Sequence, residues 1–515
     1  MPTICRPSRG HDELGSPSRR AQPFLTPHLF GLFRCICLLR ACLRACLFRA
    51  RVFRACPLLC IPLFLGACAG TRPAAERTPE MAARSSLFDV LLAKTVARDP
   101  GAQDRRAEFE QLRTRFETAA SDEELWLAIR AFHARRGRGG LDPVRAASVT
   151  DAESAGGHPT ASPDALPLEF GVDHNADASP RFFVRDLPFD PEYFLEGSRP
   201  AIGDVVVAIH GLGIDEWVRR ARELVVDSTE AATRARLAAE LRVRHTDWPR
   251  ELAPQQPTLR LRRSDGREFD VVLGWTRSPI DLWQRVDDPY YDGFSRVLTT
   301  QAFDLFDYAG SAKVLVLSCR SFATPLEADL TTLMEHATTN DLLEHDLILD
   351  FSRCAGGNDA PRLLAHLFNS PILPLVTQAA PTLGARPVEA SARVAAPAPR
   401  TRFRGHAVCL FGPCGDASVD RVASIVLDQH LAIGIGRPTN GRGTAAIDSE
   451  LLISPTTGNE LGTFHWANGE TLRGDGSLLE GNPPAMAVEL APNRENARQY
   501  YRLLIDEAMR ALGHR

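Results

Sequence analysis

The chain has 515 residues, of which 44% are hydrophobic and 24% charged. This composition is typical of a globular protein with room for two or three domains. The net charge of −4 hides an asymmetry, because residues 1–68 contain ten arginines and only two acidic residues. The remaining residues include 50 basic and 62 acidic side chains, a net charge of −12. Because the chain after residue 68 is acidic, we do not expect it to bind nucleic acid or anionic lipid by electrostatic attraction.

Residues 1–68 have the pattern of a targeting segment. Arginines precede an apolar run, Cys56–Ala67, which has the length of a signal peptide and is too short to span a bilayer. The run ends in Leu65-Gly66-Ala67-Cys68, which resembles a bacterial lipoprotein box. The alternative is a chance cysteine in a cysteine-rich stretch. We expect a lipid on Cys68 to anchor the protein in a bacterial cell envelope, on the periplasmic or outer-membrane side. The residues before the signal suggest an overextended start of the reading frame.

The pattern of the remaining chain predicts five segments. They are a Pro/Ala/Arg-rich tether at 69–84, a helical domain and loop at 85–165, a connecting strand segment at 166–200, a module at 201–275 and a core at 276–515. In the helical domain, Ser121 or Asp122 is expected to cap the last helix. No repeat at a fixed period is present in the sequence.

The module at 201–275 resembles a PDZ-like domain. Its strand Ile202–Ile209 contains Gly203-Asp204-Val205, and Asp265-Gly266 lies at the turn of a predicted hairpin. The resemblance implies that Gly203, Asp204 and Val205 bind an extended or C-terminal peptide by strand addition. His210–Gly213 could instead suggest the oxyanion loop of an α/β-hydrolase, but the chain contains no G-x-S-x-G motif.

A strand, a glycine loop and a helix follow one another in Leu347–Phe368. The apolar run that ends at Asp350 predicts a strand buried on both faces, and Gly356-Gly357 follows it. Such a turn directs free backbone N–H groups at one point and can hold an oxyanion. By itself it could equally be an ordinary strand-to-helix connection.

Two further segments change this interpretation. His406–Gly443 predicts a strand, a loop, a helix and a second strand, and ends in Pro-Thr-Asn-Gly-Arg-Gly. Together with Asp350–Gly357, this order resembles the tail-specific (C-terminal processing) serine protease family. That family has Asp-Leu-Arg-Gly-Asn-x-Gly-Gly, then Thr-x-Ser-Ala-x-Glu, then Gly-x-Pro-Thr-x-Gly-Lys-Gly. The segment Gly476–Val488 resembles the family's closing strand. The resemblance implies a mixed α/β fold with a core of the ClpP/crotonase kind.

The nucleophile position of the family falls on Ala417 when Asp420 is matched to the family's glutamate. A methyl group cannot attack a carbonyl, so either the loop is shifted by one residue and Ser418 is the nucleophile, or there is none. Gly356 and Gly357 would be the oxyanion donors.

The base position is also altered. The family's lysine corresponds to Arg442, whose guanidinium stays protonated and cannot accept a proton. The chain has two lysines, Lys94 and Lys313, and neither is expected at this site. A second branch of the family uses a histidine after the N-terminal helices, but the corresponding segment 135–143 has none. The histidines nearby, His133, His158 and His174, are expected to be ordinary surface or loop residues.

Four cysteines lie beyond residue 68, and two of them, Cys354 and Cys414, fall on loops near the expected site. In an oxidising compartment we expect these two to form a disulfide, and a thiol nucleophile is the alternative. No C-x-x-C pair occurs in the body, so a zinc site is not expected, and no cofactor is implied.

Two interpretations remain open from the sequence. The protein is a serine-type peptidase that acts on peptides or unfolded proteins, or it is a pseudoenzyme that keeps the fold as a peptide-binding or scaffolding lipoprotein. Ala417 and Arg442 together favour the inactive form.

Overall fold

The structure is a computed structural model that describes most of the chain after the predicted tether. The described residues are 77–99, 101–146, 164–173, 181–188, 193–194, 198–276, 291, 293–322, 326–357, 360–379, 401–413 and 415–514. The predicted leader, with Cys68, and the histidines at 158 and 174 lie outside them. Among the described helices, none combines the length and the apolar character needed to cross a membrane.

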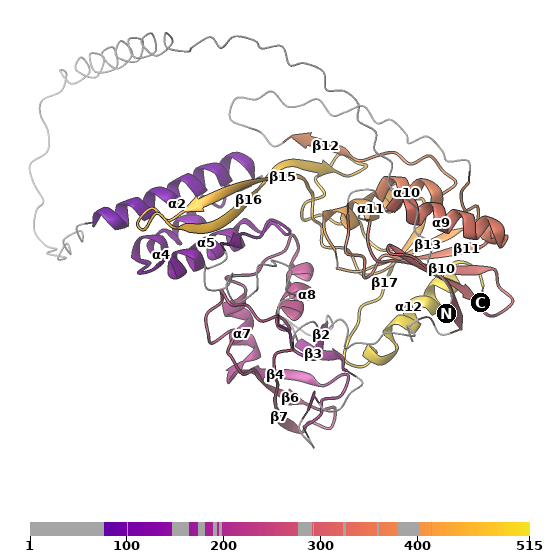
Figure 1. The fold of residues 1–515 in the computed structure, drawn as a ribbon, viewed down its shortest axis with the longest axis horizontal. Coiled ribbons are helices and arrows are strands. Elements are labelled where there is room, and N and C mark those ends of the chain that lie inside the picture. Colours follow the sequence, from indigo (N-terminus) through magenta and orange to yellow (C-terminus); the bar gives the residue numbers. More distant parts are fainter. Residues whose placement is uncertain are drawn as a thin grey trace, which may run out of the picture. The chain divides into compact units, whose positions relative to one another are not determined.

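A seven-stranded sheet forms the α/β core (Figure 1). Its strand order is β17-β14-β13-β11-β10-β9-β8. Strands β10, β11, β13, β14 and β17 are parallel, whereas β9 and β8 are antiparallel additions. The strands are β8 (Phe294–Thr299), β9 (Phe303–Tyr308), β10 (Val314–Cys319), β11 (Asp346–Asp350), β13 (Ala407–Phe411), β14 (Ile433–Gly436) and β17 (Val488–Glu489).

Helices cover both faces of this sheet, which explains why its central strands are continuous apolar runs. Figure 1 shows α9, α10 and α11 grouped together and α12 apart from them. Leu347 and Leu349 of β11 pack in the cluster that includes α9, α10 and α11, whereas Ile348 packs against α12. The helices are α9 (Leu326–Thr339), α10 (Ala360–Leu367), α11 (Ala417–Asp428) and α12 (Tyr500–Ala511).

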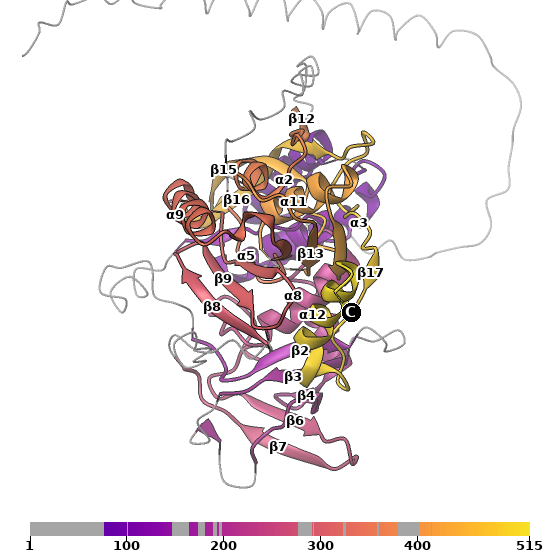
Figure 2. The ribbon, with the colours of Figure 1, turned by 90° about the vertical axis from the view of Figure 1, so that its right-hand side faces the viewer.

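A second sheet and two helices form a module that spans residues 164–276. Figure 2 shows its strands in the order β2-β3-β4-β6-β7, and β5 pairs with β4. Trp217 of α7 and Leu237 of α8 pack on this sheet. The elements are β2 (Glu169–Asp173), β3 (Arg181–Asp186), β4 (Val205–Ile209), β5 (Leu212–Gly213), α7 (Ile214–Ala221), α8 (Glu230–Glu240), β6 (Thr258–Arg262) and β7 (Glu268–Val272).

The N-terminal helices pack against a hairpin from the C-terminal part of the chain. Phe88, Phe116 and Phe132 share one core with Phe464 and Trp466 of strand β16. The helices are α2 (Pro79–Arg98), α3 (Arg106–Glu110), α4 (Arg113–Thr118) and α5 (Asp122–Arg136). The third sheet contains β1 (Val144–Arg145), β12 (Val376–Ala379), β15 (Thr444–Ile453) and β16 (Glu460–Leu472).

The mixed α/β class predicted from the sequence is confirmed, and three predicted boundaries differ. Helix α2 begins inside the predicted tether, because Thr78 caps it and Pro79 suits its first position. The segment 166–200 is no connector, because β2 and β3 belong to the module's sheet. The segment Gly476–Val488 is mostly irregular, and only the short strand β17 joins the sheet.

Candidate active site

Three loops meet at the carboxyl edge of the core sheet. Strands β11, β13 and β14 are parallel and adjacent, so the loops that follow them emerge at the same edge. The described residues of these loops are 351–357, 412–413, 415–416 and 437–443. They overlap the three segments matched to the family, Asp350–Gly357, Gly415–Asp420 and Gly436–Gly443. In open parallel sheets, this edge is where ligands bind.

The glycine loop after β11 has left-handed backbone geometry, but its two backbone N–H groups are not both free to bind an oxyanion. Gly356 and Gly357 have φ angles of 98° and 138°, which favour glycine. The backbone N–H of Gly357 donates to Ser418 Oγ at 2.8 Å. The N–H of Gly357, one of the two predicted oxyanion donors, therefore already interacts with a side chain of the protein itself.

Ser418 is the second residue of α11 and is buried, with 2% of its surface exposed. Asp416 caps this helix: its Oδ1 accepts from Ser418 N at 2.8 Å and from Ser418 Oγ at 2.5 Å. Ala417 is the first helical residue and carries no group that could react. The structure thus places Ser418, not Ala417, next to the glycine loop, but holds its hydroxyl between Asp416 and Gly357.

The Asp416 carboxylate lies directly against the glycine loop. A β-carbon built on Gly356 would lie only 2.0 Å from Asp416 Oδ1. A carboxylate at this place repels the negative charge that develops on a carbonyl oxygen during acyl transfer. The electrostatics of the loop therefore oppose an oxyanion rather than stabilise one.

Arg442, at the family's lysine position, is fixed by three charge-assisted hydrogen bonds. Its Nε and Nη2 donate to the two carboxylate oxygens of Asp227 at 3.0 and 2.5 Å, and its Nη1 donates to Gly415 O at 2.6 Å. Asp227 precedes α8 in the module, and its side chain is 2% exposed. Burial lowers the pKa of Arg442, but the hydrogen bond to Asp227 and the negative charge of Asp227 together outweigh this effect and raise the pKa overall. Arg442 therefore stays protonated and links the module to the loop before α11.

The segment predicted to lack the family's histidine does reach this region. Gly139 lies so close to the ion pair that a β-carbon there would be 1.9 Å from Asp227 Oδ1 and 2.9 Å from Arg442 Nε. A larger side chain at this position would displace the pair. Glycine at position 139 therefore allows the Arg442–Asp227 ion pair to form, and it has no side chain that could act as a general base.

His133 was expected on the surface, and this was wrong. It is fully buried on α5, with its Nε2 3.6 Å from Asp142 Oδ1 and its ring 6.1 Å from that of Phe464. Burial lowers its pKa. Its neighbours are a core aromatic ring and the Asp142 carboxylate, so it packs in the N-terminal helices and not at the glycine loop.

Asp420, matched to the family's glutamate, is completely buried behind the site. Its Oδ1 accepts from Gly441 N at 2.6 Å, while its Oδ2 has no hydrogen-bond partner in the described part of the chain. Burial raises the pKa of Asp420 to about 7. The side chain positions the loop that contains Arg442 and is partly protonated at neutral pH.

The predicted disulfide between Cys354 and Cys414 is not formed, because Cys354 is a free thiol. Cys414 lies outside the described residues. Cys354 is fully buried in the main core, and burial raises its pKa to about 12, so it is not a thiolate nucleophile. No group of three or more His, Cys, Asp or Glu side chains in the described segments could hold a metal ion.

Gly203, Asp204 and Val205 cannot receive a peptide strand as the sequence suggested. Val205 pairs with Phe183 of β3 on one side and with Arg262 of β6 on the other, so β4 lies inside the sheet. The Asp204 carboxylate accepts from Ala201 N at 2.8 Å and closes the turn before β4. The prediction was wrong because the position of a strand within its sheet depends on tertiary pairing.

A groove does lie at the edge of the same sheet, beside β2. In the described chain β2 pairs with β3 alone, and its other edge receives no strand. The groove has a volume of about 530 Å³. One side consists of β2 and α8, and the other consists of core loops that include Ser352, Gly412 and Arg437. It therefore extends from the module to the carboxyl edge of the core sheet.

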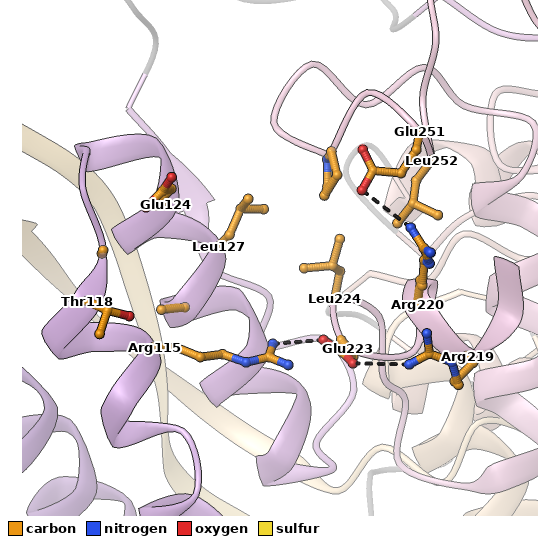
Figure 3. Close-up of a pocket in the computed structure, with 13 residues that line it drawn as sticks. Arg115, Thr118, Glu124, Leu127, Arg219, Arg220, Glu223, Leu224, Glu251 and Leu252 are labelled. Atoms are coloured by element: carbon orange, nitrogen blue, oxygen red, sulfur yellow. Dashed lines mark hydrogen bonds and ion pairs between the residues drawn. The ribbon is translucent and has the colours of Figure 1, made fainter. Parts of the chain in front are cut away.

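A second pocket lies between the N-terminal helices and α7 (Figure 3) and has a volume of about 450 Å³. Its charged groups pair with one another: Arg115 with Glu223 at 2.7 Å, and Arg220 with Glu251 at 3.6 Å. Figure 3 shows these pairs around Leu127, Leu224 and Leu252. Because these acidic and basic side chains already form ion pairs with each other, they are less available to bind a ligand. This pocket is therefore a weaker candidate site.

Comparisons with known proteins agree with this arrangement at the level of the fold. No protein-family model matches the sequence, and no curated protein sequence matches it. The structure is similar to that of mature CPAF complexed with lactacystin, with 13% identity over 84% of this chain and 98% of CPAF, and a TM-score of 0.61. It is also similar to the photosystem II D1 C-terminal processing protease, with 13% identity over 83% of this chain and 97% of that chain, and a TM-score of 0.44.

The chain has the tail-specific protease fold. At 13% identity, the similarity to CPAF concerns the arrangement of the chain and not its chemistry. Within this tail-specific protease fold, the positions that would decide catalysis hold Ala417, Ser418 and Arg442 in the contacts described above.

Two residues of the site, Asp416 and Asp227, are not predicted from the sequence. Asp416 could have been found, because an aspartate directly before a helical pattern is a typical N-cap. Asp227 gives no local signal, since its partner Arg442 is 215 positions further along the chain.

We expect the ion pair between Arg442 and Asp227 to contribute to stability as a coupled unit. Removing either partner leaves a largely buried charge without its counter-ion, so Arg442→Ala and Asp227→Ala should each destabilise the fold by about 3 kcal/mol. A double-mutant cycle by chemical denaturation should give a coupling free energy of about 1–3 kcal/mol. The exposed pair Arg260–Asp270 is the control, with a coupling near zero. Equal coupling for both pairs would contradict the structural role of Arg442.

The raised pKa of Asp420 predicts a pH-dependent effect of Asp420→Asn. Because the pKa in the folded state lies near 7 and above the ordinary value, protonation stabilises the fold at low pH. This contribution is lost as the pH rises to 7. Relative to the wild type, the variant should therefore gain stability as the pH rises from about 4, the ordinary value, to about 7, by up to roughly 4 kcal/mol. Exposed Asp215→Asn controls for net charge. A pH-independent difference would show that Asp420 is ionised throughout.

Proposed function

We propose that the protein is a peptide-binding lipoprotein of the bacterial cell envelope that keeps the tail-specific protease fold without its hydrolytic activity. The observation that supports this most directly is the environment of Ser418. Its hydroxyl interacts with a carboxylate and a backbone N–H, and the cation at the family's base position is paired with Asp227. A serine without a general base is a weak nucleophile.

The electrostatics of the glycine loop support the same conclusion independently. Stabilisation of the developing oxyanion usually contributes a large part of the rate enhancement in acyl transfer. Here the Asp416 carboxylate lies against Gly356, and the N–H of Gly357 is engaged by Ser418. A peptidase would need to move Asp416 before either loop donor could serve a substrate.

Peptide binding is supported by the groove beside β2. An edge strand with a helix next to it accepts an extended peptide through main-chain hydrogen bonds, as PDZ-like domains do. The strand β2, the helix α8 and a volume of about 530 Å³ match that mode of binding. We therefore assign peptide binding to β2 and α8 in place of Gly203–Val205.

The envelope location rests on the sequence of the leader. A basic region, an apolar run and Leu65-Gly66-Ala67-Cys68 occur in the order that lipoprotein processing requires. A lipidated Cys68 would tether the folded part to a membrane through the Pro/Ala/Arg-rich segment that follows.

The second candidate function is a serine peptidase in which Asp416 is the base. The hydrogen bond of 2.5 Å between Ser418 Oγ and Asp416 Oδ1 favours it. A carboxylate is a weak general base for a serine hydroxyl, and the negative charge of Asp416 opposes the oxyanion. One experiment distinguishes the two functions.

Hydrolysis by the wild type and by Ser418→Ala should be equally absent. We expect no cleavage of unfolded-protein peptides above background and no labelling of Ser418 by a fluorophosphonate probe, as mapped by mass spectrometry. Peptide binding should be unchanged in the variant, since Ser418 lies outside the groove lining. If instead the wild type cleaves and Ser418→Ala loses on the order of 10³-fold or more, Ser418 is a nucleophile and the inactive assignment is wrong.

Cys68→Ala should abolish lipidation. In a bacterial host supplied with a labelled fatty acid, the wild type should carry the label on a mature N-terminus at residue 68, because lipid attaches to the cysteine of the box. The variant should accumulate as an unprocessed, unlabelled precursor. Cys60→Ala, inside the apolar run, is the matched control and should be processed normally. Normal cleavage and labelling of Cys68→Ala would exclude this anchor.

A further inference from the structure

Strand β15 is a long edge strand with apolar side chains on its outer surface (Figure 1). It spans Thr444–Ile453 and, in the described part of the chain, pairs with β16 alone. The backbone groups along its other edge therefore receive no strand from these residues. Ile447 and Leu451 are each 53% exposed, and Ile453 is 45% exposed. An open edge of this kind can pair with a strand from another chain.

The outer face of the hairpin carries a patch of apolar side chains. The side chains of β15 alternate between two faces from residue 447 to residue 453. The inner face packs on the N-terminal helices, and the outer one holds Ile447, Ser449, Leu451 and Ile453. Val144 of β1, 59% exposed, lies in the same row as Leu451, because both pair with one residue of β16. Four of the nine exposed large apolar side chains of the described residues belong to this face, so they form a patch and are not scattered.

The two acidic side chains of β15 are neutralised within the chain. Asp448 and Glu450 lie on the inner face, where Arg98 and Lys94 of α2 pair with them at 3.1 and 2.5 Å. Edge strands are usually protected from pairing by exposed charges, especially lysine, or by proline. Strand β15 contains no lysine, arginine or proline. Its edge therefore carries little charge that would repel a second strand.

Other sheet edges of the protein differ from β15 in this respect. Strand β8 ends the core sheet and carries the exposed Arg296. Strand β7 ends the module's sheet and carries the exposed Glu268 and Asp270 at alternate positions. Another strand that approached either edge would have to desolvate these charges. Among these edges, β15 is thus the one whose outer face is both open and uncharged.

We propose that β15 pairs with β15 of a second copy of this chain, in antiparallel orientation about a two-fold axis. The two small sheets then join into one continuous sheet. This inference goes beyond the proposed function and does not rest on it. Two identical strands related by a two-fold axis perpendicular to the sheet run in opposite directions, so the antiparallel ladder follows from the symmetry.

The distribution of side chains along β15 favours a second copy as the partner. A two-fold contact requires a surface that is complementary to itself. Ile447 lies on one side of the middle of β15, whereas Leu451 and Ile453 lie on the other. Antiparallel pairing about the middle therefore brings Ile447 of each copy next to Leu451 or Ile453 of the other. The uncharged outer face offers nothing to attract anionic lipid, which the acidic body disfavours as well.

The size of the contact predicts a reversible dimer. A strand of ten residues is about 33 Å long. Its edge and outer side chains come close to the lower limit of specific interfaces, about 1,000 Å² over both partners. We therefore expect a dissociation constant in the micromolar range, with monomer and dimer both populated across that range.

The test is sedimentation velocity of the purified full chain over a concentration series, under reducing conditions so that cysteines do not link the copies. The wild type should change from monomer to dimer. Leu451→Lys places like charges close together across the axis and should weaken dimerisation at least roughly tenfold. Val297→Lys, at an exposed position on β8, makes the same change of charge and should have no effect. Thermal melts show whether each variant is folded.

Hydrogen exchange of the wild type tests the same contact without any substitution. Protection of the amides of β15 should rise with protein concentration, because the outward N–H groups become hydrogen-bonded in the dimer. Protection of β8 should not depend on concentration. This measurement decides the question even if Leu451→Lys does not fold.

Three results would overturn the proposal. The first is a wild type that stays monomeric throughout the series, which would mean that another part of the chain or a different partner covers β15. The second is a dimer that Leu451→Lys leaves unchanged and whose formation does not protect β15. The third is growth beyond a dimer, because pairing about a two-fold axis closes after two copies.

Discussion

The ion pair between Arg442 and Asp227 is the contact on which the arrangement of the site depends. It brings together a core loop, the segment before α8 and, through the close approach of Gly139, the loop after α5. A pair this buried is tolerable only when its donors are satisfied, and Arg442 donates from Nε, Nη1 and Nη2 to Asp227 and Gly415. The carbonyl of Gly415 is thereby fixed one residue before the Asp416 cap of α11.

The same contacts support the proposal that the site does not hydrolyse peptides. A nucleophilic serine needs a proton acceptor beside it and hydrogen-bond donors opposite it. Arg442 supplies a permanent cation where an acceptor would be needed, and Asp416 supplies an anion where donors are needed. If the protein is inactive as proposed, both features contribute, so restoring a single residue would not restore the chemistry.

The regular elements of the core could be predicted from the sequence because they depend on local pattern. The strand, helix and second strand that the sequence predicts within His406–Gly443 are present as β13, α11 and β14. Pairing partners could not be predicted, since nothing local to Val205 indicates that β3 and β6 flank it. For the same reason β2 was not recognised as an edge strand. The nucleophile position was ambiguous by one residue, because Asp416 fixes the helix start through a side-chain contact that a gapless comparison does not contain.

The glycines of the two loops, Gly356, Gly357 and Gly415, are needed for the fold whether or not the protein is a catalyst. Gly356 needs its φ of 98°, and any β-carbon there would collide with the Asp416 carboxylate. Gly415 is equally constrained, because a β-carbon would lie 2.4 Å from Cys354 O. Each glycine allows one loop to pass close to the other, and the Gly357 N–H then holds Ser418 in place. A strand–glycine loop–helix pattern therefore identifies the fold and the meeting of the loops, whereas the side chains around it determine whether that place hydrolyses a peptide or only binds one.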